Sequence, residues 1–507
     1  MADEGRKRKM QRKKGANFMK NLFKKIGALL VAAVMVLSMC TAVFADGNAN
    51  VEIKLKNFEN AKKVEYMQII QKDESTTSGW AFMNEAGACF IEALGMTDSA
   101  DAQQEVIWGL IKFKDPKVVL PTGVTAKTVT AADIDLALSK VAALTGFREL
   151  TDETKTKIEV SEAGIYAIKA EEEGYTYKTA TAYVGFGVGV DGSYPVLEDT
   201  EVAAKKSSTS VDKTTEDADH VVAIGDIVTY TIEAYVPFID AANTENRTFT
   251  ITDKITGADY YLTGPNAVNS VTMAGKDGQV GEIVVNDKGN GFTVDLGELV
   301  ADTANPNAGK KITVTYTVKV NETTVKNEAG SHAAGVDYGG NNVPVKLFTG
   351  ELVLMKYGDG DVNKALEGAE FVLYKDGEEV PLTFVKEEKT GKYKYAPDTE
   401  GADSKLVTDA NGYIDVEGLD VGSYHFEETK APKGYSINTD GKTLTLTVDG
   451  EVATAKLYNE GGLNDTKLNS LPSTGGMGTY LFTIIGVVVM AGAAGAFFIS
   501  RRKGSEE

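Results

Sequence analysis

The chain has 507 residues, of which 73 are acidic and 53 basic, and its formal net charge is -20. This balance disfavours a nucleic-acid partner, because phosphates attract basic patches, and it suits a soluble surface protein whose copies repel one another. The chain has two cysteines, Cys40 and Cys89. Cys40 lies in a predicted leader, so the mature chain can form no internal disulfide, and any internal cross-link needs other chemistry.

Residues 1–45 are typical of a signal peptide. Basic residues that include Lys24 and Lys25 precede an apolar run at 26–39, and the small residues Val43 and Ala45 come before a predicted cut after Ala45. A retained N-terminal anchor is the alternative, but the run is too short for a good membrane span. Met19 is an alternative start, since the residues before it make an unusually long basic region.

Residues 46–200 form the first predicted unit, a mixed α+β domain. The tryptophans Trp80 and Trp108 are expected in its core. Alternation of apolar and polar residues predicts strands, and a helical pattern predicts one helix. The strands are expected at 51–55, 164–169 and 179–184, and the helix at 131–138.

Residues 201–348 and 349–460 form two further units that read as all strand. Their candidate strands are rich in Val, Ile, Thr and Tyr and are separated by Gly, Asn and Asp turns, which favours antiparallel β-sandwiches. The fold class is therefore mainly β, with tandem sandwich domains after the mixed first domain. The candidate strands are 226–235, 248–253 and 311–320 in the second unit, and 351–356, 370–374, 422–427 and 443–448 in the third.

The C-terminal end carries three features in order. A polar linker at 461–470 leads to the pentapeptide Leu471-Pro472-Ser473-Thr474-Gly475. Residues 476–507 follow, with an apolar segment at 480–500 of bilayer-spanning length and then a basic tail that stays in the cytoplasm by the positive-inside rule.

This arrangement resembles the LPxTG cell-wall sorting signal of sortase substrates. The resemblance implies that a sortase cysteine cuts between Thr474 and Gly475 and holds Thr474 as a thioester. An amine then takes over the threonyl carbonyl.

The third unit resembles the CnaB-type, prealbumin-like domains of Gram-positive pilins. The residues that carry the resemblance are YHFEETKAPKGY at 424–435, which is similar to the pilin E-box, LEGAEFVLY at 366–374, and the closing pair Tyr458-Asn459. The resemblance implies an isopeptide bond between Lys356 and Asn459, with Glu428 between them as the catalytic acid. Burial lowers the pKa of a lysine and raises that of a carboxyl, so a neutral amine could attack the amide while Glu428 shuttles protons. The alternative is an edge-strand lysine that guards against aggregation.

The second unit is similar, more loosely, to the fimbrial isopeptide-forming domain. The residues that correspond to the bonded pair of that domain are Lys213 and Asn327, which lies near the end of the unit. The resemblance implies a bond between Lys213 and Asn327, and Asp253 is the candidate acid. Lys205 and Lys206 compete for the lysine role, and a plain Ig-like sandwich with solvated lysines is the alternative.

The lysine that would join subunits departs from the pilin pattern. Shaft pilins carry a Tyr-Pro-Lys motif between their first two domains, whereas Tyr194-Pro195 is followed here by Val196. Lys205, preceded by two alanines, fits a second register as the nucleophile toward Thr474 of another subunit, with Lys206 as the alternative.

These features predict a structural shaft subunit of a sortase-polymerised, wall-anchored pilus that supports adhesion. Its expected partners are a sortase, other copies of itself, accessory pilins and peptidoglycan, with a host surface ligand left open and no nucleic acid. No cofactor or metal is expected. A non-polymerised wall adhesin or basal pilin is the alternative, and a wall-anchored enzyme is the least favoured reading.

Overall fold

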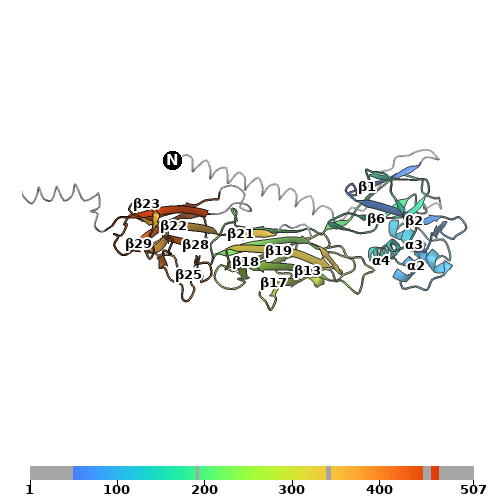
Figure 1. Ribbon diagram of the computed structural model, residues 1–507. Helices are drawn as coiled ribbons and strands as arrows, with labels where there is room; N and C mark the ends of the chain where they lie inside the picture. The colour runs from blue at the N-terminus through green and yellow to red at the C-terminus, as the bar shows by residue number, and fades with distance from the viewer. Residues whose placement is uncertain (1–49, 190–192, 339–343, 449–457, 468–507) are drawn as a thin grey trace, which may run out of the picture.

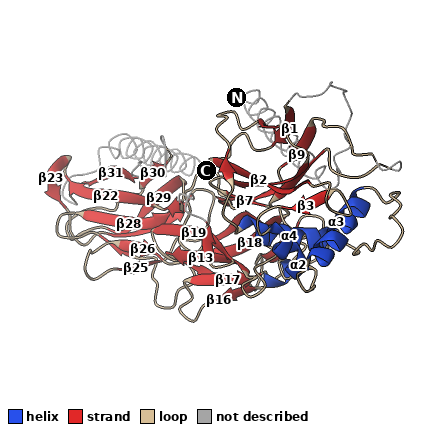
Figure 2. Cartoon of the chain, turned by 90° about the vertical axis from the view of Figure 1, so that its right-hand side faces the viewer, coloured by secondary structure: helices blue, strands red, loops and turns tan. Residues whose placement is uncertain are grey.

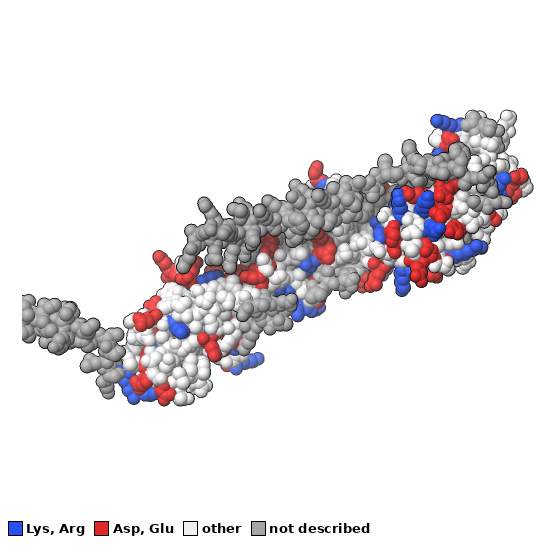
Figure 3. Space-filling model, turned by 90° about the horizontal axis from the view of Figure 1, so that it is seen from above, with Lys and Arg blue, Asp and Glu red and all other residues white. Residues whose placement is uncertain are grey.

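The computed structural model describes residues 50–189, 193–338, 344–448 and 458–467. Three units follow one another along an elongated body, with the helices gathered in the first (Figure 1). Acidic and basic side chains are interspersed along the face in Figure 3. The predicted signal peptide, sorting motif and C-terminal span lie outside the described residues, and within the described ranges no helix is long and apolar enough to cross a bilayer.

The first unit is mixed α+β, as predicted. Its main sheet has five strands in the order β3-β2-β6-β8, with β4 paired to β2, and a second sheet has the order β5-β1-β9. The helices lie together beside the main sheet (Figure 2). The elements are β1 Val51–Lys56, β2 Lys63–Lys72, β3 Trp80–Phe82, α2 Ala86–Ala93, α3 Ala100–Lys114, α4 Ala131–Ala142, β4 Arg148–Glu149, β5 Lys157–Val160, β6 Gly164–Glu171, β7 Tyr175–Tyr177, β8 Ala180–Val184, β9 Thr200–Ala203 and β10 Lys206–Ser208.

Local sequence explains where the longer helices of this unit begin. Ser99 caps α3 by accepting a hydrogen bond from the backbone of Ala102. Thr130 and Asp133 form a reciprocal capping box at the start of α4. Trp80 and Trp108 lie in the core between helices and sheet, as predicted. Strands β9 and β10 pair with β1 and β7, so the sheets of this unit extend beyond the predicted limit at residue 200.

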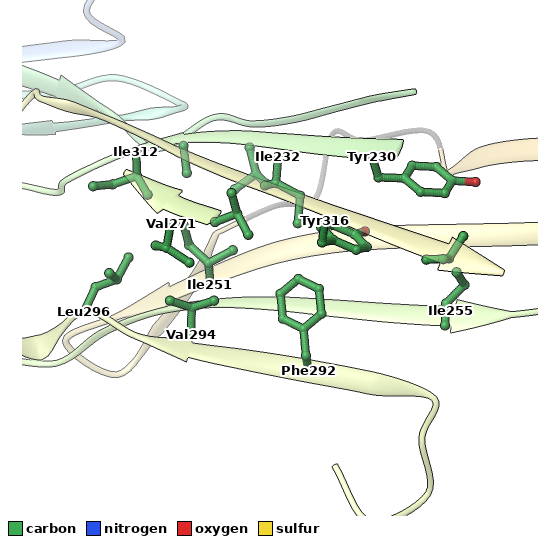
Figure 4. Packing of buried hydrophobic residues seen from close by; sticks show 14 of the residues in the cluster. Tyr230, Ile232, Ile251, Ile255, Val271, Phe292, Val294, Leu296, Ile312 and Tyr316 are labelled. Atoms are coloured by element: carbon green, nitrogen blue, oxygen red, sulfur yellow. The ribbon is translucent and has the colours of Figure 1, made fainter. Parts of the chain in front are cut away.

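The second unit is the predicted antiparallel sandwich. One sheet has the order β11-β12-β18-β14, with β15 paired to β18, and the other has the order β16-β17-β13-β19-β20, with β21 paired to β19. Strand β12 buries every second residue, from Val228 to Ala234, which is the period of a half-buried strand. The inward residues form one core (Figure 4). The elements are β11 Val211–Thr215, β12 Ile227–Tyr235, β13 Phe249–Thr256, β14 Ala258–Tyr260, β15 Asn269–Met273, β16 Ile283–Val285, β17 Gly291–Asp295, η1 Gly297–Leu299, β18 Lys311–Val320, β19 Thr324–Ala333, β20 Val336–Tyr338 and β21 Val345–Phe348.

The third unit is also a two-sheet sandwich. One sheet has the order β23-β22-β28-β26-β25 with β31 paired to β22, and the other has the order β27-β24-β29-β30. The last strand, β31, runs parallel to β22 and reaches Asp465, five residues beyond the predicted end of the unit. The strands are β22 Gly350–Gly358, β23 Asp361–Ala365, β24 Glu370–Lys375, β25 Phe384–Lys386, β26 Tyr393–Tyr395, β27 Leu406–Val407, β28 Tyr413–Leu419, β29 Gly422–Lys430, β30 Lys442–Leu446 and β31 Tyr458–Asp465.

Hydrogen bonds join neighbouring units. Ser207 donates from its hydroxyl to the carbonyl of Val236 at 2.6 Å, between the first and second units. The backbone N–H of Ile224 donates to the carbonyl of Gly418 at 2.9 Å, between the second and third. Each unit therefore contacts the next through ordered backbone as well as through the chain itself.

Candidate cross-linking sites

Lys356 is the most deeply buried cation in the third unit. It lies on β22 with none of its surface exposed, although lysine is almost never fully buried without a partner. Its Nζ donates to Glu428 Oε2 at 3.0 Å and also to Asp465 Oδ1. The ring of Phe371 lies 5.4 Å from the amine. The amine is therefore enclosed by two carboxyls and an aromatic ring, away from water.

The structure separates Lys356 from its predicted partner Asn459. Asn459 pairs with Leu352 in the β22–β31 register, and its amide donates to the carbonyl of Thr445 at 2.7 Å. Asp465 lies six residues further along β31, which corresponds to about 20 Å of strand. The predicted contact between Lys356 and Asn459 is therefore wrong, because the last strand continues through the segment that was read as a linker and presents Asp465 to the lysine.

The two carboxyls beside Lys356 come from different strands. Glu428 belongs to β29, and its Oε2 also accepts the backbone N–H of Asn438 at 2.8 Å. Burial, opposed by Lys356 and reinforced by Glu428, raises the pKa of Asp465 to about 6. Glu428 Oε1 and Asp465 Oδ2 are buried without a hydrogen-bond partner in the part of the chain that the structure describes. A buried carboxyl with a raised pKa beside an amine can exchange its proton with that amine, which is the starting condition for amide formation.

The second unit brings Lys213, Asp253 and Asn327 into one buried cluster. Lys213 is on β11, Asp253 on β13 and Asn327 on β19. The side chains of Lys213 and Asp253 are 1% and 0% exposed and form an ion pair. Asp253 occupies an inward position of β13 between Ile251 and Ile255, where an apolar residue would be usual.

Two tyrosine hydroxyls complete this cluster. Tyr316 donates to Asp253 Oδ2 at 2.8 Å, receives a hydrogen bond from Asn327 Nδ2 at 3.0 Å, and is also contacted by the amine of Lys213. Tyr260 donates to Asp253 Oδ1 at 2.6 Å. Asn327 is fully buried, and its Oδ1 has no hydrogen-bond partner among the described residues. The lysine and the asparagine thus meet on one phenol oxygen.

The electrostatics of the second cluster favour a neutral amine. Burial, only partly offset by Asp253, lowers the pKa of Lys213 to about 8. Burial also raises the pKa of Asp253, although Lys213 and the two tyrosines oppose that shift. Both directions favour transfer of a proton from the amine to the carboxylate.

Lys206 and Lys205 lie apart from this cluster. Lys206 pairs with Glu172, which also accepts a hydrogen bond from the hydroxyl of Tyr177, and its amine lies 4.2 Å from the ring centre of Tyr175. Lys205, one residue earlier, is exposed. Neither lysine competes with Lys213 for Asp253. The two differ in accessibility, since the amine of Lys206 is bound by Glu172 and Lys205 is exposed to solvent.

Sequence reasoning missed Asp465, Tyr316 and Tyr260. The alternation of Leu463 and Asp465 on one strand face is a signal for Asp465, but the surrounding Gly and Asn residues resemble a linker. Tyr316 and Tyr260 stand in strands as ordinary β-favouring residues, so composition gives no sign of their contacts. In the described ranges no group of His, Cys, Asp and Glu is arranged to hold a metal ion. The sorting motif Leu471-Pro472-Ser473-Thr474-Gly475 lies outside those ranges.

Two family models match the chain. Residues 350–461 match the SpaA prealbumin-like fold domain, and residues 464–506 match the LPXTG cell wall anchor motif. The chain therefore carries a prealbumin-like domain of the SpaA type followed by an LPXTG cell wall anchor motif. The chain is similar to the trypsin-resistant surface T6 protein of Streptococcus pyogenes serotype M6, at 29% identity over 166 residues, and to the fimbrial subunit type 1 of Actinomyces viscosus, at 27% over 180.

These matches cover parts of each protein. The aligned regions span 19% and 32% of this chain and 31% and 33% of the two relatives. Among solved structures, the T6 backbone pilin of S. pyogenes has a TM-score of 0.48 at 14% identity, covering 80% of this chain and 81% of that one. The major pilin SpaD of Corynebacterium diphtheriae has a TM-score of 0.45 at 18% identity, covering 84% and 100%. At these values the structural likenesses support no conclusion about function.

Proposed function

We propose that this chain is the shaft subunit of a covalently polymerised, wall-anchored pilus, stiffened by one internal isopeptide bond in each of its last two domains. The observation that carries the proposal is the burial of two lysine amines, each against a carboxyl inside a β-sandwich. Lys356 contacts Glu428 and Asp465, and Lys213 contacts Asp253. Burying a charge costs several kcal/mol unless it is compensated. Condensation of each amine with its neighbouring group would explain why these polar residues are buried.

In the third domain the bond joins Lys356 to Asp465. The neutral amine attacks Cγ of the protonated Asp465 carboxyl, the new N–C bond forms, and a C–O bond breaks. Glu428 accepts a proton from the nitrogen and supplies one to the departing hydroxyl, so that one water leaves. Asp465 is the acceptor because it lies on the last strand, whereas Glu428 is also held by the backbone of Asn438.

In the second domain the bond joins Lys213 to Asn327. The amine attacks Cγ of the Asn327 amide, and one ammonia leaves when the C–N bond of that amide breaks. Asp253 is the base that takes the proton of the attacking nitrogen. Its ion pair with Lys213 supports this role.

These bonds would shorten the path that carries tension. Force entering the third domain along β22 would cross from Lys356 to Asp465 and bypass the residues between them. In the second domain it would cross from Lys213 to Asn327. A shaft that must resist extension needs such a bypass, because a hydrogen-bonded sheet can otherwise unzip from its end strands.

Polymerisation requires an accessible amine and the sorting motif. Lys205 is exposed, whereas Lys206 is held by Glu172 and aromatic rings. A sortase would therefore join the Lys205 amine of one subunit to Thr474 of another and join the last subunit to peptidoglycan. Accessory pilins and a host surface ligand belong to the same proposal, on the strength of the sequence resemblance.

The polymer is tested by boiling wall extracts in detergent and separating them by size. We expect a ladder of high-mass bands that disappears with Lys205→Arg, because a guanidinium stays protonated and is no nucleophile. Lys206→Arg is the matched control and should keep the ladder. A ladder that survives both substitutions together would contradict the lysine assignment, and a single wild-type band would favour the stand-alone adhesin or basal pilin.

A further inference from the structure

The two buried lysines differ in the group that must leave. Lys356 faces a carboxyl, which releases water, and both neighbouring carboxyls contact the amine directly. Lys213 faces an amide, which releases ammonia. An amide nitrogen is a poor leaving group until it gains a proton, so the second domain needs a donor aimed at Asn327 Nδ2.

Among the described residues, no hydrogen bond joins Asp253 to that nitrogen. The Asp253 oxygens bond to Lys213, Tyr316 and Tyr260. The hydrogen bond of Asn327 Nδ2 goes to the hydroxyl of Tyr316, at 3.0 Å. The route from the acid to the leaving nitrogen therefore passes through one phenol oxygen.

We propose that Tyr316 is a catalytic residue of the second domain, relaying a proton from Asp253 to the departing nitrogen of Asn327. This inference rests on the Lys213–Asn327 bond proposed above. Tyr316 touches the attacking nitrogen, the base and the leaving nitrogen, and it is fully buried between Tyr230 and Phe292 (Figure 4).

The relay balances in protons. Asp253 already holds the proton that it took from the Lys213 ammonium when the neutral amine attacks Cγ of Asn327. The leaving nitrogen, now tetrahedral at its carbon, has a lone pair and becomes an acceptor. Tyr316 then turns its O–H from Asp253 to that nitrogen and receives the proton from Asp253 in exchange. The C–N bond breaks, ammonia departs, and Asp253 takes the extra proton of the former lysine nitrogen, so that Tyr316 and Asp253 return to the protonation states that they had before the attack.

The environment suits a relay that never becomes a free anion. Burial, reinforced by the charge of Asp253, raises the pKa of the Tyr316 hydroxyl well above its ordinary value. A phenol in such a site can pass a proton on only while it accepts another. Rings stack or meet edge-on around it, with Phe292 at 4.9 Å and Tyr230 at 5.9 Å between ring centres, which holds the phenol oxygen in place while its O–H can still rotate.

Tyr260 provides the matched control. Its hydroxyl also donates to Asp253, at 2.6 Å, but to the other carboxylate oxygen, and within the described part of the chain it forms no hydrogen bond with Lys213 or Asn327. If Tyr316 only held Asp253 in place, removal of either hydroxyl would slow the reaction alike. A relay predicts that only the Tyr316 hydroxyl is needed for rapid loss of ammonia.

The experiment follows the intact mass of the soluble region 46–470 over time after purification. We expect Tyr316→Phe to lose its ammonia at least about 100-fold more slowly than wild type, the usual range for one proton-transfer group, while Tyr260→Phe stays within about tenfold. Loss of water from the third domain is an internal control, and it should occur normally in both variants. Protease resistance equal to that of Lys213→Ala, which is unlinked, would show that Tyr316→Phe still folds.

A second measurement keeps the hydroxyl but changes its acidity. Replacing Tyr316 with a ring-fluorinated tyrosine should change the rate of ammonia loss, whereas a merely structural hydroxyl would leave that rate unaltered. Equal rates for wild type, Tyr316→Phe and the fluorinated protein would overturn the relay and leave the bond itself intact. Absence of ammonia loss from wild type would instead remove the Lys213–Asn327 bond, and the relay with it.

Discussion

Lys356 on the first strand of the third domain donates a hydrogen bond to Asp465 on the last strand, across 109 residues of sequence. The two strands lie side by side in parallel, and Lys356 is opposite Leu463 in their register. A covalent bond at this point would close the sandwich across its first and last strands. The partner of this lysine is therefore the feature of the domain that most needs testing.

Asp465→Ala should abolish the loss of water from the third domain, because it removes the carbon that the amine attacks. The variant should also leave Lys356 buried beside Glu428 alone and lower the stability of the domain. A cross-link closing a loop of this length contributes about 4–5 kcal/mol in the chain-entropy account of disulfides. Intact mass and thermal unfolding measure the two effects.

Asn459→Ala is the matched control on the same strand. Its amide bonds only to the backbone of Thr445 among the contacts of the described residues. We expect the full loss of water and a melting temperature close to that of wild type. Loss of the cross-link in this variant, with Asp465→Ala unaffected, would restore the original sequence prediction.

Glu428→Gln should slow bond formation in the third domain by about 100-fold or more, because an amide can accept the Asn438 N–H but cannot shuttle protons. Glu427→Gln, one residue earlier and exposed on β29, is its control and should react normally. Time-resolved intact mass separates the two. Equal rates in both variants would remove Glu428 from the reaction.

The buried amine of Lys213 should make stability depend on pH in a variant that cannot form the Lys213–Asn327 bond. Its pKa is lowered from 10.5 to about 8 in the folded state, mainly by burial. Between these values the unfolded chain binds the extra proton, so stability should rise as the pH increases from about 8 to about 10.5. In chemical unfolding of Asn327→Ala across this range, the free energy of unfolding should increase by about 3 kcal/mol. The double variant Asn327→Ala/Lys213→Met is the control and should show no such increase.

Gly418 packs against Ile224 at the junction of the second and third domains. It has a φ of +91°, its carbonyl accepts the N–H of Ile224, and a Cβ there would lie 2.6 Å from Ile224 Cδ1. Gly418→Val should therefore loosen the junction while leaving each core intact. We expect faster proteolysis near residue 224 with unchanged loss of water and ammonia, and equal proteolysis rates would contradict a packed junction.

Sequence patterns predicted most of this fold and only part of its sites. Strand β18 begins and ends where the alternation from Lys311 to Val320 predicts, because one face is buried along its whole length. Lys213, Asp253 and Asn327 lie in one buried cluster, and the bond between Lys213 and Asn327 that the resemblance implies stays a prediction. The prediction that Asn459 is the partner of Lys356 was wrong because the Gly and Asn residues of β31 have little strand propensity. The position of this strand is fixed instead by its pairing with β22.

Contacts between distant strands explain what remained hidden. Tyr316 and Tyr260 reach Asp253 through sheet packing, which depends on register and not on any local motif. The two alternating faces of a strand can be read from sequence, but the residue that lies across the sandwich cannot. For the same reason, Asp465 became a candidate only when the end of β31 was seen beside β22.

The intact mass of the soluble region 46–470 tests the two internal bonds together. We expect a mass lower than that of the sequence by one ammonia and one water, with fragmentation joining the peptide of Lys213 to that of Asn327 and the peptide of Lys356 to that of Asp465. A folded protein with the full unmodified mass would contradict the account.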